Sequence, residues 1–428
     1  MTRHLAFYLA TMLLYTSAAQ AQQASEPETG TVRLSDQAEA APAVTQADSP
    51  AESSDIAARL TNLEKWQQRA PTVGGFLQLR YERYNETGFD KNDQHRFSMP
   101  NARLNFTDRN GLDMLTGRLH YRFELDFGRG AFDIKDLYAD MEFHNLLSLR
   151  AGQFKVPYSF ATLMSDNRTQ FAETPLARIN SFGRDVGAML HGSDMLLDDV
   201  VGISYSVGAF AGDGANVLNN TNGAYLYAGR VLLHVLGTTD TDEADLITCP
   251  YWLNFNQQCS DGRAPALSVG GSGAINPKNA YGQDYELDRK DLRWAVEAHF
   301  DAYGLTMHAE WLQGRMDKGA TAGVLHRRAY YAALGYNPIW LPWLEPVLRH
   351  EWHDYDQDKT ATELEFQARR KTTAGLNLYL AGHNAKIQMD YVLIDVTEGK
   401  YTQSVDAGGN PVGPLYGDRV YLQLQAGF

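Results

Sequence analysis

Basic side chains with the chemistry to bind oxyanions recur along the first half of the chain. They lie on the polar side of segments in which polar and apolar residues alternate, at Arg80, Arg103, Arg118, Arg122 and Arg150, with Lys155 at the end of one segment. Arginine stays charged and offers a planar pair of donors that fits carboxylate and phosphate groups. Such residues around the narrow section of a water-filled passage would attract anions.

An alternative of equal weight is that these cations brace a hydrated wall. Acidic residues occur on the same polar faces, at Glu82, Glu124, Asp126, Asp136, Asp140 and Glu142. Pairs of opposite charge on neighbouring strands are common in sheets and would neutralise the arginines. The spacing alone leaves both interpretations open.

The sequence carries no recognisable catalytic or metal-binding motif. His350-Glu-Trp-His353 lacks the spacing of a zinc site, and two histidines three residues apart on a strand point to opposite sides. No nucleophile elbow or phosphate-binding glycine loop occurs. Gly270-Gly-Ser-Gly273 falls in a polar stretch and is interpreted as a flexible linker. We therefore expect no enzyme, no cofactor and no metal site.

The residues that could do chemistry are carried by segments of period two. From 115 to 127, odd positions are almost all apolar and even positions are polar, which indicates a strand between an apolar and a wet environment. Fifteen such segments are predicted, at residues 76–84, 97–107, 115–127, 134–143, 147–155, 184–191, 200–210, 225–235, 292–301, 305–313, 328–336, 346–355, 372–380, 385–393 and 419–427. Because a closed bacterial barrel has an even number of strands, we expect about sixteen.

Several features place these strands in a membrane. Many run nine to thirteen residues, the length that a tilted strand needs to cross a bilayer. Aromatic residues lie near strand ends, as at Tyr84, Trp311 and Trp352. Tight turns at 301–304 and 382–384 contrast with long polar stretches at 237–290 and 394–418, which predicts short turns at one end and long loops at the other. The chain ends in an amphipathic strand and Phe428, as exported barrels do.

The N-terminal region predicts export. Arg3, an apolar run from Leu5 to Tyr15 and Ala19-Gln-Ala21 form a signal peptide over residues 1–21. Residues 22–54 lack large apolar side chains and predict a disordered linker. Residues 55–70 fit a short amphipathic helix, either packed on the domain or forming a coiled-coil stalk. The barrel would then occupy residues 71–428.

Composition limits the remaining possibilities. Lys and Arg number 38 against 52 Asp and Glu, a net charge of −14 that argues against nucleic-acid binding. Cys249 and Cys259 would enter an oxidising compartment after export and could form a disulfide, or stay as two unpaired thiols.

Two motifs resemble a known family. Gly152-Gln-Phe-Lys-Val-Pro-Tyr-Ser-Phe160 and Arg184-Asp-Val-Gly-Ala-Met-Leu-His-Gly192 are similar to those of the phosphate-selective porins O and P, with Tyr158 where phenylalanine is usual. The resemblance implies an all-β, antiparallel, sixteen-stranded barrel in the bacterial outer membrane that forms a homotrimer. It also implies that the loop between the motifs, residues 157–184, folds into the lumen. That loop carries Arg168, Arg178 and Arg184 against Asp166 and Glu173.

The sequence therefore predicts a passive pore for small hydrophilic solutes. We expect it to be surrounded by outer-membrane lipid and to prefer small anions such as phosphate, although the acidic balance of the chain weakens the case for phosphate. The alternatives left open are a secreted or surface β-rich protein that binds ligands such as glycans, a barrel enzyme, and a barrel channel for other solutes.

Overall fold

The three-dimensional structure is a computed structural model of the chain. It describes Arg59 and residues 70–85, 94–108, 111–197, 201–217, 220, 223–237, 265–277, 290–317, 324–338, 340–355, 357, 368–398 and 417–428. The predicted signal peptide, the linker, the 55–70 helix apart from Arg59 and Ala70, and both cysteines lie outside the described residues. Within the described ranges, no helix is long and apolar enough to cross a membrane.

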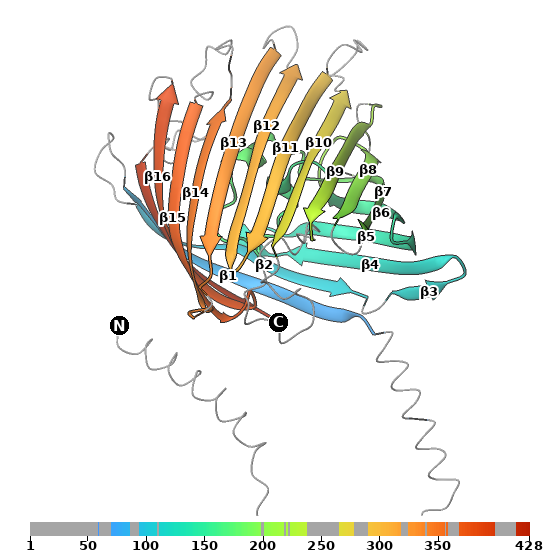
Figure 1. Cartoon of the computed structure of the whole chain (residues 1–428), viewed down its shortest axis with the longest axis horizontal. Coiled ribbons are helices and arrows are strands. Elements are labelled where there is room, and N and C mark those ends of the chain that lie inside the picture. Colours follow the sequence, from blue (N-terminus) through green and yellow to red (C-terminus); the bar gives the residue numbers. More distant parts are fainter. Residues whose placement is uncertain are drawn as a thin grey trace, which may run out of the picture. The chain divides into compact units, whose positions relative to one another are not determined.

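The described chain is almost entirely β-structure (Figure 1). Each of the fifteen predicted segments overlaps a strand. The strands are β1 (Thr72–Asn85), β2 (Gln94–Thr107), β3 (Leu112–Met114), β4 (Gly117–Asp126), β5 (Asp133–His144), β6 (Leu147–Lys155), β7 (Arg184–Leu197), β8 (Val201–Phe210), β9 (Leu226–Leu236), β10 (Ala266–Pro277), β11 (Lys290–Ala302), β12 (Leu305–Asp317), β13 (Val324–Tyr336), β14 (Leu344–Asp354), β15 (Ala368–Ala381), β16 (Ala385–Glu398) and β17 (Gly417–Gly427). The helical elements are η2 (Gly128–Gly130), α3 (Phe160–Leu163) and η3 (Leu176–Asn180).

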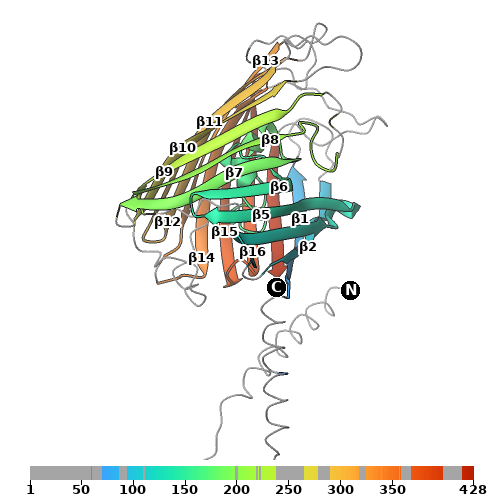
Figure 2. The ribbon, with the colours of Figure 1, turned by 90° about the vertical axis from the view of Figure 1, so that its right-hand side faces the viewer.

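The strands form one closed antiparallel barrel (Figures 1 and 2). Each strand pairs with its sequence neighbours, and β17 returns to β1 with Gly427 opposite Phe76 and Asp418 opposite Asn85. Both β2 and β3 pair with β4, β2 along its upper part and β3 next to its start, so they occupy one position in the wall. The seventeen strands thus make sixteen wall positions, as predicted.

Strand β10 corrects the interpretation of Gly270–Gly273 as a flexible linker. The four residues lie inside a strand that pairs with β9 and β11 over its length. A Cβ at Gly270 would come within 2.3 Å of the Val231 carbonyl oxygen, so the close approach of β9 requires glycine there. Because glycine and serine add little hydropathy contrast, the alternation that identifies the other strands is weak in this one.

The same strand also corrects the predicted distribution of loops. It divides the stretch 237–290, and in the antiparallel order β9 ends and β10 begins at the end of the barrel that holds the Tyr303–Gly304 turn. The long connection from β9 to β10 therefore starts and finishes at the end of the tight turns, contrary to the expectation that all long connections lie at the other end.

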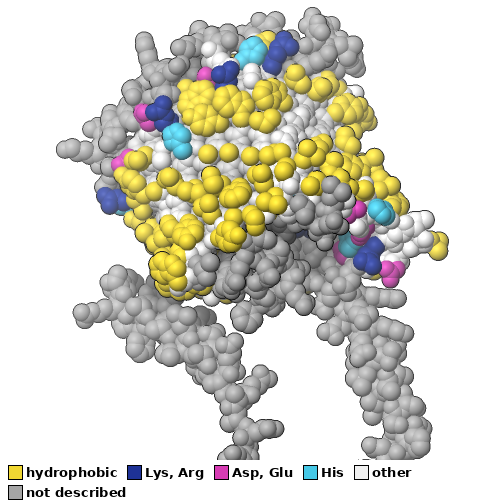
Figure 3. Space-filling view, viewed as in Figure 1, with side chains coloured by type: hydrophobic (Ala, Val, Ile, Leu, Met, Phe, Trp, Pro, Cys, Tyr) yellow, Lys and Arg dark blue, Asp and Glu magenta, His cyan; other side chains and the backbone are white. Residues whose placement is uncertain are grey.

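The two faces of the wall differ as the alternation predicts. On β12, Met307 and Trp311 are exposed on the outside, whereas His308 and Glu310 are buried on the inside. Figure 3 shows hydrophobic side chains over the visible wall and charged ones along its upper margin. Exposed apolar residues occur on strands all around the barrel and include Leu77, Leu137, Leu149, Val231, Leu292, Val296, Leu348, Met389 and Leu422. Such a surface suits the hydrocarbon of a bilayer.

We expect Gly270→Ala to destabilise the barrel by about 1–3 kcal/mol, the usual cost of overpacking, because the new methyl group would meet backbone atoms of β9. Gly273→Ala is the matched control, since the nearest atom to its Cβ would be 3.9 Å away. Thermal unfolding in detergent, followed by the heat-dependent shift in gel mobility, measures both. Equal melting temperatures for the two variants would contradict the close packing of β9 against β10.

Candidate functional site: the lumen and its inward loop

The loop between β6 and β7 begins with contacts deep inside the barrel. The Glu310 carboxylate on β12 accepts hydrogen bonds from the backbone N–H groups of Phe160 (3.0 Å) and Ala161 (3.1 Å). Lys155 Nζ donates to the carbonyls of Leu163 (2.8 Å) and Met164 (2.9 Å), at the end of α3. Apolar side chains of this part, among them Tyr158 and Phe160, pack with inward residues of the wall in the largest buried cluster of the described residues. The prediction that this loop folds inward is confirmed.

The middle of the loop lies along the inner faces of strands from both ends of the chain. Gln78 of β1 donates to Asp166 O (2.9 Å), and Gln425 of β17 donates to Asn167 O (2.8 Å). The carbonyl of Thr169 accepts from Lys386 Nζ (2.8 Å) and Gln388 Nε2 (3.0 Å) of β16. The inward polar side chains thus supply the hydrogen bonds that an irregular segment needs when it is removed from bulk water.

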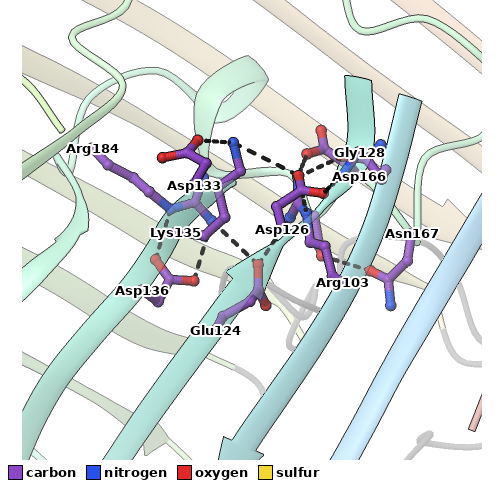
Figure 4. Close-up of polar contacts among 12 residues, drawn as sticks. Arg103, Glu124, Asp126, Gly128, Asp133, Lys135, Asp136, Asp166, Asn167 and Arg184 are labelled. Carbon is purple, nitrogen blue, oxygen red and sulfur yellow. Dashed lines mark hydrogen bonds and ion pairs between the residues drawn. The ribbon is translucent and has the colours of Figure 1, made fainter. Parts of the chain in front are cut away.

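Two carboxylates of the loop are each held by two cations. Asp166 contacts Arg103 of β2, and its Oδ1 lies 2.7 Å from Nη1 of Arg178 (Figure 4 shows Arg103 and Asp166). Burial raises the pKa of Asp166, but Arg178 and Arg103 outweigh it and hold that pKa well below its usual range.

Glu173 Oε2 lies 2.8 Å from Lys371 Nζ, and Oε1 accepts a hydrogen bond from the Tyr421 hydroxyl (2.6 Å). Arg419 Nη1 lies 3.9 Å from the same Oε1. Burial again opposes ionisation, yet Lys371 and Arg419 lower the pKa of Glu173 to about 2. Both loop carboxylates are therefore ionised at neutral pH.

The loop leaves a cavity of about 640 Å³ in the lumen. Its described lining has nine basic and four acidic residues, a formal surplus of five positive charges. The basic ones are Arg80, Arg103, Arg129, Lys135, Arg178, Arg184, Arg369, Lys371 and Arg419, and the acidic ones are Asp126, Asp133, Asp166 and Glu173. A low-dielectric wall with such a lining concentrates anions in the passage.

The structure places the predicted site residues in different environments. Arg80, Arg178 and Arg184 line the main cavity, whereas Arg150 lines a second one of about 320 Å³ below β6 and β7 together with Lys155. Arg122 and Arg168 are not among the residues that line either cavity. Arg118 lies near the start of β4, half exposed, 3.7 Å from the exposed Asp113, so its position does not support a role in the narrow section.

Several predicted cations also make the pairs that the alternative interpretation required. Arg184 forms two hydrogen bonds with Asp136, of 2.7 and 3.1 Å, and Arg103 lies 3.0 Å from Glu124 and 3.2 Å from Asp126 (Figure 4). Wall bracing and a positive lining therefore coexist, because the lining contains more cations than acids.

Five lining cations were not singled out in the sequence: Arg129, Lys135, Arg369, Lys371 and Arg419. Two of them carried a usable signal, since Arg419 has the parity of the inward Tyr421 and Gln423, and Lys371 that of the inward Thr373. Arg129 had none. It lies in η2 between β4 and β5 with a φ of 59°, a left-handed backbone that only the fold imposes.

A closed barrel with an apolar exterior, a polar lumen and an inward loop is the architecture of an outer-membrane porin. The chain belongs to the phosphate-selective porin O and P family, whose sequence model matches residues 72–427. It is thus a channel of the bacterial outer membrane, and members of this class are typically not enzymes. No curated protein matches the chain.

Solved porin structures share the fold at low sequence identity. OmpT of Vibrio cholerae, in its trimer form, gives a TM-score of 0.53 at 12% identity and covers 84% of this chain and 100% of its own. An anion-selective porin from Comamonas acidovorans gives 0.53 at 10% identity, over 84% of this chain and 99% of that one. OmpF of Salmonella typhi, in complex with daunomycin, gives 0.55 at 12% identity, over 84% and 98%.

The charged contacts of the loop predict a pH window. The depressed pKa values of Asp166 and Glu173 stabilise the attached loop above the usual carboxyl range, and this contribution is lost as pH falls from about 4.5 towards 2. Single-channel currents should therefore be steady from about pH 7 to about pH 4 and become noisy only in stronger acid. Asp166→Asn provides the reference for a loosened loop. Noise with a midpoint near pH 4.5 would show carboxyls of ordinary pKa and contradict the tight pairing.

Proposed function

We propose that this channel lets small hydrophilic solutes diffuse passively and prefers anions. The observation that carries the proposal is the surplus of cations around the main cavity, where nine basic residues face four acidic ones. The negative charge of the whole chain does not oppose this, because selectivity depends on the groups that line the narrow section. Carboxylates and phosphates fit the arginine forks of this lining. The positions of His350, on the outer side of β14, and His353, on the inner side, support our further proposal that the chain has no enzymatic activity.

We also propose the organisation of the whole chain. Residues 1–21 direct export, 22–54 form a linker, 55–70 a short helix, and the remainder is the barrel, which is surrounded by outer-membrane lipid. We propose a homotrimer as well, supported by the trimer form of OmpT of Vibrio cholerae, which shares the fold.

The anion preference can be measured as a reversal potential in a planar bilayer with a KCl gradient. Arg129→Gln should lower the anion-to-cation permeability ratio about two- to fivefold, because it removes an exposed charge from the cavity lining. Arg118→Gln makes the same change in charge at the far end of β4 and should leave the ratio unchanged. Cation preference in the unmodified channel would refute the proposal.

The trimer predicts a mass three times that of the processed chain. Native mass spectrometry of detergent-extracted protein, or gel electrophoresis without heating, should show this species, and boiling should convert it into the monomer. A monomeric mass in mild detergent at every protein concentration would contradict trimerisation.

A further inference from the structure

One acidic side chain of the inward loop sits among donors that would suit a solute. Glu173 meets Lys371 of β15 and both Arg419 and Tyr421 of β17 at the distances given above. These four residues come from three separate segments that the barrel closure brings together. The Glu173 side chain keeps 27% of its surface exposed and, with Lys371 and Arg419, lines the main cavity.

The donor set has the composition of an oxyanion site. An ammonium group, a guanidinium group and a phenol hydroxyl converge on the two oxygens of a single carboxylate. Charge-assisted hydrogen bonds of this kind bind carboxylate and phosphate oxygens alike. Glu351 is a second acid near Lys371, at 3.6 Å, but its closer cation is Arg349, at 3.0 Å.

Asp166 differs from Glu173 in what its removal would leave behind. Arg103, which contacts Asp166, already lies within 3.2 Å of both Glu124 and Asp126. Neutralising Asp166 would therefore leave Arg103 paired. At Glu173, the donors that would be released face the open cavity.

We propose that Lys371, Arg419 and Tyr421 form a binding site for carboxylate or phosphate oxyanions, and that Glu173 is a tethered anion that occupies this site and competes with the solute. The inference rests on the proposed anion channel and deepens it. A permeating oxyanion binds by exchanging with the Glu173 carboxylate, so this residue sets how strongly the lumen retains anions.

The loop does not depend on the Glu173 carboxylate for its position. Glu310 and Lys155 hold its start, Asp390 accepts a hydrogen bond from the Ala172 N–H (2.7 Å), and Arg349 Nη1 donates to the backbone carbonyl of Glu173 itself (2.9 Å). A side-chain change at Glu173 therefore leaves the other attachments of the loop in place.

The test compares Glu173→Gln with Asp133→Asn. Both variants remove one negative charge from the lining of the same cavity, but Asp133 pairs with Lys135 near the start of β5, away from the proposed site. Single-channel chloride current is recorded while inorganic phosphate is added, and separately while succinate is added. Glu173→Gln should lower the half-blocking concentration of phosphate, of succinate or of both about fivefold, the effect of one charge at about 4 Å in water. Asp133→Asn should resemble the unmodified channel.

The phosphate and succinate arms distinguish which oxyanion the site prefers. Equal block of Glu173→Gln and Asp133→Asn by both anions would overturn the inference and leave only a general effect of charge. If Glu173→Gln fails to insert, Tyr421→Phe decides, because it removes one donor without changing the charge: weaker block than in the unmodified channel supports the site, and unchanged block overturns it. The proposed function is judged separately, by the reversal potential of the unmodified channel.

Discussion

Every residue of the wall has to satisfy two solvents at once. Hydrocarbon offers no hydrogen bonds, so each backbone group of a spanning strand must pair with a neighbouring strand, and the sheet must close. The pairing of β17 with β1 meets this requirement, and Phe428 extends it through two hydrogen bonds with Gly75. Once the barrel is closed, alternate side chains point to lipid and to the lumen, and the polar set is confined to a small enclosed volume.

That enclosure explains the charge pairs of the interior. Arginines and lysines on the inner wall lie close to acids of neighbouring strands, and the loop adds Asp166 and Glu173 to the same space. Since ions inside a narrow lumen are screened less than on an open surface, most of them are stable only in pairs. The surplus of cations that is left around the cavity is what a permeating solute meets.

The inward loop depends on the same wall. Its backbone is irregular, and side chains such as Glu310, Gln425 and Lys386 supply partners for its N–H and carbonyl groups. Inward residues therefore have two functions, since some attach the loop and others face the solute. Lys155 shows why a list of cations is not a list of pore residues: its ammonium group is committed to two carbonyls of the loop.

The sequence by itself determined the wall, because a period of two over a strand-length segment has one physical cause, a surface between lipid and water. It failed at β10, where glycine and serine replace the contrast on which the pattern depends, and there only pairing with β9 and β11 reveals the strand. The tertiary structure alone decided which cations meet. Lys371 and Arg419 are 48 residues apart, and both are about 200 or more from Glu173, yet closure and the inward loop place the three together, because side-chain contacts across a barrel follow from strand register and not from distance along the chain.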